Sequence, residues 1–154
     1  MNRGKQFENK FKEDFLKLQG SLVERLPDQM SGYSGSKNVC DYICYKYPTL
    51  FFIECKVTEA NTFPLCNLSQ YDELIQRQGK QGVRAGVVIW FQKHDRVCYV
   101  PILTFKSLKE DNKKSVNVKM LDSEEYRIIN IPSRKKRIFL DSDYSTLLDL
   151  HEGD

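Results

Sequence analysis

The chain has 154 residues, of which 40% are hydrophobic and 29% charged, as in ordinary soluble globular proteins. This length predicts a single domain, covering residues 1–154, with a core of its own. The formal net charge of +3 is too small to indicate a nucleic-acid partner, so only local basic patches can argue for one. The polar N-terminus and the absence of a long apolar run predict a cytoplasmic protein with no membrane partner.

The cysteines are five in number, with no Cys-x-x-Cys pair, which favours buried reduced thiols over disulfides. They are Cys40, Cys44, Cys55, Cys66 and Cys98. A zinc site made by Cys40, Cys44 and Cys55 stays open as an alternative, although its spacing differs from that of a zinc knuckle.

The first predicted element is an amphipathic helix from Asn2, its N-cap, to about Arg25. Its apolar residues recur every three or four positions: Phe7, Phe11, Phe15, Leu18 and Leu22. Glu8 lies beside this stripe and could reach a neighbouring sheet, although the pattern alone favours an ordinary surface glutamate. The serine- and glycine-containing stretch 27–38 predicts a loop.

A β-hairpin is predicted next, with strands at 39–45 and 50–57 and a turn at 46–49. A turn centred between Tyr47 and Pro48 places Asp41 opposite Glu54, and such neighbours have Cβ atoms about 4.5–5.5 Å apart. Because side chains alternate along a strand, Glu54 and Lys56 share one face.

Two carboxylates this close repel each other unless a proton or a cation lies between them. A small set of oxygen ligands suits Mg²⁺, which retains waters and takes phosphate oxygens as further ligands. Such an ion can activate a water and stabilise charge on a phosphoryl group, with Lys56 to orient the water or neutralise that charge. By itself, however, a Glu-x-Lys pair is more often a solvated surface pair.

The middle of the chain predicts an irregular connection at 59–68 and a helix from Ser69 to about Gln78, within which Gln70 or Asp72 could face the carboxylates. The β-branched run 83–91 predicts a central strand, paired with a strand at 97–102.

The C-terminal third predicts a short helix from Thr104 to about Glu110, a weak strand near 126–131, a strand at 138–140 and a last helix ending near Leu150. Between these, the basic run 134–137 could bind phosphates, or it could simply be a solvated segment.

With its predicted helices and strands in this order, the sequence resembles the RecU family of Holliday junction resolvases, including phage-encoded relatives, within the PD-(D/E)xK nuclease superfamily. The residues that carry the resemblance span roughly 2–105: Asn2-Arg3-Gly4, Phe7-Glu8, Asp41, Glu54-Cys55-Lys56 and Thr62-Phe63-Pro64-Leu65-x-Asn67. The resemblance implies an α/β fold with a restriction-endonuclease-like core, in which helices flank a mixed central β-sheet. It also implies a homodimeric endonuclease that uses Mg²⁺, or Mn²⁺ as a substitute, and cuts two opposed strands of a four-way DNA junction.

The same resemblance assigns roles to individual residues. Asp41 and Glu54 would be metal ligands, joined by the carbonyl oxygen of Cys55. Lys56 would act on the attacking water or the phosphate, and Glu8 would support the site. Gln70 is a weaker catalytic candidate, because its helix aligns with a one-residue ambiguity. The candidates for DNA contact are Arg3, Lys5, Tyr33 and Lys37.

The sequence also departs from the family pattern. Cys40 replaces the superfamily's proline, and the loop 27–38 is short for the stalk that related enzymes insert into the junction. The chain is shorter than many cellular relatives, which favours a bacteriophage origin and hence the host cytoplasm.

Two other functions stay open. One is a related nuclease that acts on other branched or duplex DNA, and the other is a non-catalytic DNA- or protein-binding module on the same fold. The presence of Asp41, Glu54 and Lys56 together argues against a degenerate site.

Overall fold

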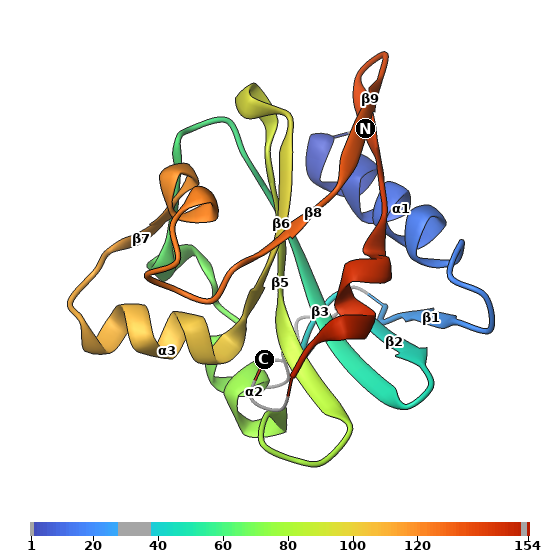
Figure 1. Cartoon of the computed structure of the whole chain (residues 1–154), viewed down its shortest axis with the longest axis horizontal. Coiled ribbons are helices and arrows are strands. Elements are labelled where there is room, and N and C mark those ends of the chain that lie inside the picture. The colour runs from blue at the N-terminus through green and yellow to red at the C-terminus, as the bar shows by residue number, and fades with distance from the viewer. Residues whose placement is uncertain (1, 28–37, 152–153) are drawn as a thin grey trace.

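A six-stranded mixed sheet forms the centre of the computed structural model, which describes residues 2–27, 38–151 and 154 (Figure 1). In spatial order its strands are β1 (Leu22–Arg25), β2 (Tyr42–Lys46), β3 (Thr49–Thr58), β5 (Val83–Phe91), β6 (Arg96–Pro101) and β8 (Ile129–Ile131). The strands β3 and β5 are parallel, and every other neighbouring pair in this sheet is antiparallel. The predicted α/β class with a mixed central sheet is confirmed, and it is compatible with a restriction-endonuclease-like core.

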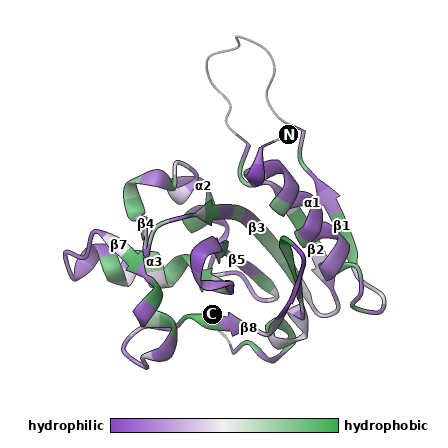
Figure 2. Ribbon diagram, turned by 90° about the horizontal axis from the view of Figure 1, so that it is seen from above, coloured by the Kyte–Doolittle hydropathy of each residue, from purple (hydrophilic) through white to green (hydrophobic). Residues whose placement is uncertain are grey.

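Helices cover both faces of this sheet. Figures 1 and 2 show α1 (Arg3–Phe15) on one side, and α2 (Tyr71–Arg77) with α3 (Ile102–Glu110) on the other. Each face has its own buried cluster: Phe11 and Phe51 belong to the cluster under α1, and Leu74 and Phe105 to the cluster under α2 and α3. Because β5 is covered on both faces, it is apolar along most of its length, as the sequence predicts.

The first helix starts as predicted but ends ten residues early. The backbone N–H of Lys5 donates to Asn2 Oδ1 at 2.8 Å, which confirms the N-cap. The expected continuation to Arg25 is wrong, because Gly20 takes a φ of +76° and the chain then turns back as strand β1 beside β2. Leu22 continues the apolar spacing but is 53% exposed on this edge strand.

A buried carboxylate ties α1 to the C-terminal part of the chain. The side chain of Asp14 is only 1% exposed, and its Oδ1 lies 2.9 Å from the ammonium groups of both Lys10 and Lys17. Its Oδ2 accepts a hydrogen bond from the backbone N–H of Ser142 at 3.0 Å. Lys10 also donates to Asp141, so α1 and the segment around Ser142 are joined by a buried polar network.

Several predicted element boundaries are shifted. Gln70, not Ser69, is the N-cap of α2. Helix α3 begins at Ile102, and the Thr104 hydroxyl donates to the carbonyl of Arg127 at 2.5 Å. The predicted last helix is a 3₁₀ helix (Tyr144–Asp149), following the N-cap Asp143.

Two small ribbons lie outside the central sheet. The predicted irregular connection at 59–68 contains β4 (Thr62–Pro64), which pairs with β7 (Ser115–Asn117). The strand predicted at 138–140 is β10 (Phe139–Ser142), and it pairs with β9 (Ser133–Lys136).

Candidate active site

The candidate site lies just before the first residue of β2, at the point where β3 extends beyond its antiparallel partner. The pairing of β2 with β3 ends at Tyr42 opposite Ile53, and one further step in this register places Asp41 opposite Glu54, as predicted. Beyond that point β3 is paired only with β5. Asp41 Oδ2 accepts a hydrogen bond from the backbone N–H of Cys55 at 2.9 Å. A side-chain carboxylate thus satisfies a backbone donor at the point where the neighbouring strand stops.

Glu54 is buried beside this carboxylate, with 2% of its surface exposed. Its carboxyl group shares a hydrogen bond with Asp41, and Lys56 Nζ lies 3.5 Å from Glu54 Oε2. Burial, followed by the hydrogen bond and charge of Asp41, raises the pKa of Glu54 to about 9, whereas Lys56 acts to lower it. Without a bound cation, the raised pKa therefore favours a protonated Glu54 at neutral pH.

One oxygen of this pair has no partner. Glu54 Oε1 is buried and makes no hydrogen bond within the described part of the chain. A buried acceptor without a partner costs stability, so such an atom calls for an explanation. This oxygen, Glu54 Oε1, belongs to one of the two side chains that the sequence predicts as metal ligands.

The first helix brings Glu8 to the same place. Its carboxyl group shares a hydrogen bond with Asp41, while Arg25 Nη2 lies 3.0 Å and Lys5 Nζ 3.6 Å from Glu8 Oε2. Burial and the charge of Asp41 raise the pKa of Glu8 above its ordinary value. The Tyr42 hydroxyl donates to the backbone carbonyl of Glu8 at 2.9 Å and so fixes α1 against β2.

Two residues that position this site were not identified from the sequence. The helical spacing predicts Arg25 in the first helix, whereas it lies on β1 and pairs with Glu8. The pattern predicts Tyr42 only as a strand residue, whereas its hydroxyl also donates to the Glu8 carbonyl. Leu22 and Val23 are both apolar, so the sequence shows no alternation at 22–24, and the strand depends on pairing with β2.

The side chain of Cys55 points away from the carboxylates, as the alternation predicts. It is buried in the cluster under α1 with Cys44, whereas Cys40 belongs to the opposite cluster. The three thiols therefore do not converge, which removes the support for the zinc alternative. All five cysteines are unpaired, and only Cys66 is exposed. A role for the Cys55 carbonyl oxygen stays a prediction.

The other candidates are more scattered. Gln70 has a buried Oε1 that makes no hydrogen bond among the residues that the structure describes, to Asp41 and Glu54 or to any other. Arg3 lies near the start of α1, two residues before Lys5. Tyr33 and Lys37 lie outside the described residues.

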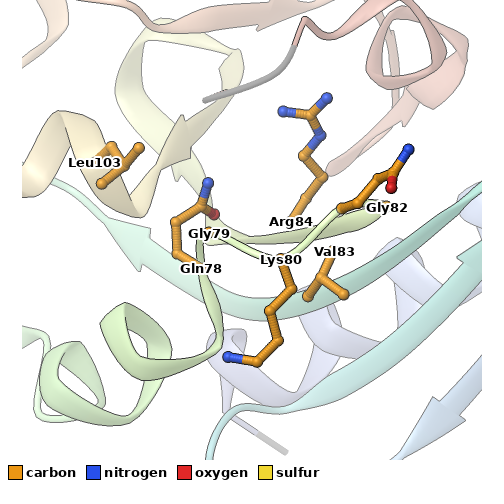
Figure 3. Close-up of a pocket in the computed structure, with 8 residues that line it drawn as sticks. Gln78, Gly79, Lys80, Gly82, Val83, Arg84 and Leu103 are labelled. Carbon is orange, nitrogen blue, oxygen red and sulfur yellow. The ribbon is translucent and has the colours of Figure 1, made fainter.

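A separate pocket lies at the start of β5, between α2 and α3. Its lining includes Lys80, Arg84 and Leu103 (Figure 3). The side chains of Lys80 and Arg84 point in different directions, so the pocket presents no single charged group (Figure 3). Arg84 donates instead to the backbone carbonyl of His151. The pocket residue on β5 nearest to the site is Arg84, three residues before Val87, the partner of Glu54. The lining of the pocket includes neither Asp41 nor Glu54.

The fold is α/β with a mixed central sheet, compatible with a restriction-endonuclease-like core, and the site adds an acidic pair and a lysine at the end of a hairpin. A family model described as "RecU: Recombination protein U" matches residues 19–140. The chain belongs to the RecU family, which implies a Holliday junction resolvase-type nuclease that binds junction DNA.

The matched residues include Asp41, Glu54 and Lys56, but begin after α1 and therefore exclude Glu8. No curated protein matches the chain. Among the described residues, no helix is long and apolar enough to cross a membrane.

Proposed function

We propose that the protein is a metal-dependent endonuclease that resolves four-way DNA junctions at the site formed by Asp41, Glu54 and Lys56. The observation that carries this proposal is the buried carboxyl group of Glu54 beside the half-buried one of Asp41, with Glu54 Oε1 left without a partner among the described residues. Family membership supplies the substrate class.

The residues present fit a Mg²⁺ ion, for which Mn²⁺ could substitute. Among residues 2–27, 38–151 and 154, no three His, Cys, Asp or Glu side chains form a complete metal cage. Magnesium does not need one, because one or two carboxylates, waters and phosphate oxygens usually complete its coordination. Asp41 and Glu54 would hold the ion, which would displace the proton from Glu54, and the Cys55 carbonyl oxygen would add a ligand.

When bound, the ion would supply Lewis acidity and an activated water. The Lys56 ammonium group, whose side chain is 26% exposed, would orient that water or neutralise charge on the phosphate. Glu8 would act as a positioning residue through its contact with Asp41, because Arg25 and Lys5 already balance its charge. Gln70 stays a weaker candidate for a role at this site.

The protein is proposed to act as a homodimer in the cytoplasm. One chain provides a single Asp41–Glu54 pair, whereas resolving a junction needs two opposed cuts. A junction has approximate two-fold symmetry, and a closed dimer is the simplest arrangement that supplies two symmetric sites.

Separating cutting from binding tests the assigned roles. Asp41→Asn or Lys56→Ala is expected to abolish cleavage of a synthetic four-way junction and to leave binding largely intact, because binding rests on many phosphate contacts. Glu124→Gln is a matched control, since this exposed carboxylate makes no ion pair within the described residues. Equal loss of cutting and binding would contradict the roles. Faster cleavage of a flap or a linear duplex than of the junction would favour the related-nuclease alternative, and binding by the wild type without any cleavage would favour the non-catalytic module.

A further inference from the structure

The β9–β10 ribbon, residues 133–142, packs β10 on the body of the protein and leaves β9 exposed. Figure 1 shows it rising beside the start of α1. Its strands are joined by only two residues, Arg137 and Ile138, and all four residues of β9 are exposed. Because a strand rises about 3.3 Å per residue, four paired residues carry the tip roughly 13 Å from the base.

The strand β10 is fixed to the body along its length, from Phe139 beside the turn to Ser142 at the base. The Phe139 ring lies 5.7 Å from the Trp90 ring, and the guanidinium group of Arg3 lies 5.4 Å from the Phe139 ring centroid. Lys10 donates to Asp141, and the Ser142 N–H donates to Asp14. The ribbon is therefore held by α1, the helix that brings Glu8 to the candidate active site.

Four consecutive cations follow β9 into the turn: Arg134, Lys135, Lys136 and Arg137. Lys135 pairs with Asp95 at 3.1 Å and Lys136 with Asp141 at 3.3 Å, and both lysines are exposed. Arg134 and Arg137 make no ion pair with any described residue. The fold therefore satisfies the two lysines with ion pairs but gives the two arginines none among the described residues.

The two turn residues, Arg137 and Ile138, are also unusual residue types for a hairpin turn. Arg137 has a φ of +48°, a backbone conformation that hairpin turns usually assign to Gly, Asn or Asp. Ile138 follows it with 55% of its surface exposed. A strained cation beside an exposed apolar side chain, on an otherwise well-anchored ribbon, points to a role outside the fold.

We propose that the β9–β10 ribbon is a DNA-contacting arm. Arg134 and Arg137 bind backbone phosphates, and Ile138 packs against base faces at the branch point. Stacking is interrupted at a branch point, and apolar side chains on DNA-binding proteins commonly insert at unstacked steps. The ribbon's unpaired cations complement a polyanion, which favours DNA over an ordinary protein surface as the occupant. This inference rests on the proposed function, because it assumes a junction as substrate.

Binding of a labelled synthetic four-way junction in EDTA, across a range of salt concentrations, tests the phosphate contacts. Arg134→Gln/Arg137→Gln is expected to weaken binding by about tenfold or more and to reduce the magnitude of the salt slope by about two. The control, Lys113→Gln/Lys114→Gln, removes the same charge from an exposed loop and is expected to change affinity less than about twofold. Wild-type affinity in the ribbon variant, or an equal loss of affinity in both variants, would overturn the proposal that the ribbon contacts DNA.

The turn itself allows a test that separates binding from folding. Arg137→Gly relieves the positive φ, so it should raise the melting temperature while weakening junction binding. A variant that loses both stability and affinity would indicate a structural role and overturn the proposal.

Ile138→Asn keeps every charge and tests the apolar contact. It is expected to leave the salt slope unchanged and to reduce the preference for the junction over a linear duplex by about tenfold. An unchanged preference would remove Ile138 from the contact. If the wild-type protein does not cleave the junction, the proposed nuclease function is rejected. If the wild type cleaves the junction but the ribbon variants bind it normally, only the proposed DNA contact by the ribbon is rejected.

Discussion

Replacing Glu54 by glutamine should stabilise the metal-free protein while abolishing its activity. Burial and Asp41 raise the pKa of Glu54 from its ordinary 4.5 to about 9. At about pH 8 the folded protein holds a proton on this group, whereas the unfolded chain has released it. Folding must therefore take up a proton, which costs about 1.4 kcal/mol per pH unit above 4.5, or roughly 5 kcal/mol at pH 8.

Glutamine has nothing to ionise and can still donate to Asp41, so Glu54→Gln should recover most of this cost. It forfeits only the 3.5 Å contact with the partly exposed Lys56. We expect a gain of roughly 2–5 kcal/mol at about pH 8, or a rise of about 5–15 °C in melting temperature. The sign follows from the raised pKa: this contribution to wild-type stability is fully present below about pH 4.5 and is lost as the pH rises toward 9.

The assay is thermal unfolding of both proteins in EDTA at about pH 5 and pH 8. The gain should shrink to less than about 1 kcal/mol at the lower pH, where the unfolded glutamate is itself largely protonated. Added Mg²⁺ should stabilise the wild type but not the variant, because a ligand raises the stability of the state that binds it. A variant no more stable than wild type at about pH 8, or an equal gain at both pH values, would refute the reasoning.

Two further substitutions test the fold that positions the site. Asp14→Ala should lower the free energy of unfolding in urea by about 3–5 kcal/mol, because Lys10 and the Ser142 N–H lose a buried acceptor. A loss below about 1 kcal/mol would contradict the importance of this network. Gly86→Ala places a Cβ 2.5 Å from Tyr99 Cζ and should cost about 1–3 kcal/mol, with Tyr99→Leu in the same chain relieving part of the loss. Wild-type stability of Gly86→Ala would show that the close packing is not needed.

Local signals predicted those parts of the fold that depend on neighbouring residues. The run Val83–Phe91 is apolar except for Arg84 and contains the β-branched stretch Val87–Ile89, and its bounds agree with those of β5. The register that sets Asp41 opposite Glu54 followed from the short turn at Tyr47 and Pro48. Such features need no knowledge of distant contacts.

Long-range packing decided the rest. The spacing of Leu18 and Leu22 continues that of the helix before them, and only the edge of β2 favours a strand at 22–25. The pairing of β4 with β7 joins segments about fifty residues apart, which alternation within either segment does not reveal. The contacts of Glu8 with Asp41 and Arg25 likewise depend on how α1 packs against the hairpin, so the sequence offered Glu8 only as a candidate.

Cleavage of a synthetic mobile four-way junction by the purified protein, with and without Mg²⁺, tests the central claim most directly. The account predicts paired cuts in opposed strands with Mg²⁺, none in EDTA, and recovery when Mg²⁺ is added back. Persistent cutting in EDTA would reject metal-dependent catalysis, and an intact junction under all conditions would reject the nuclease assignment itself.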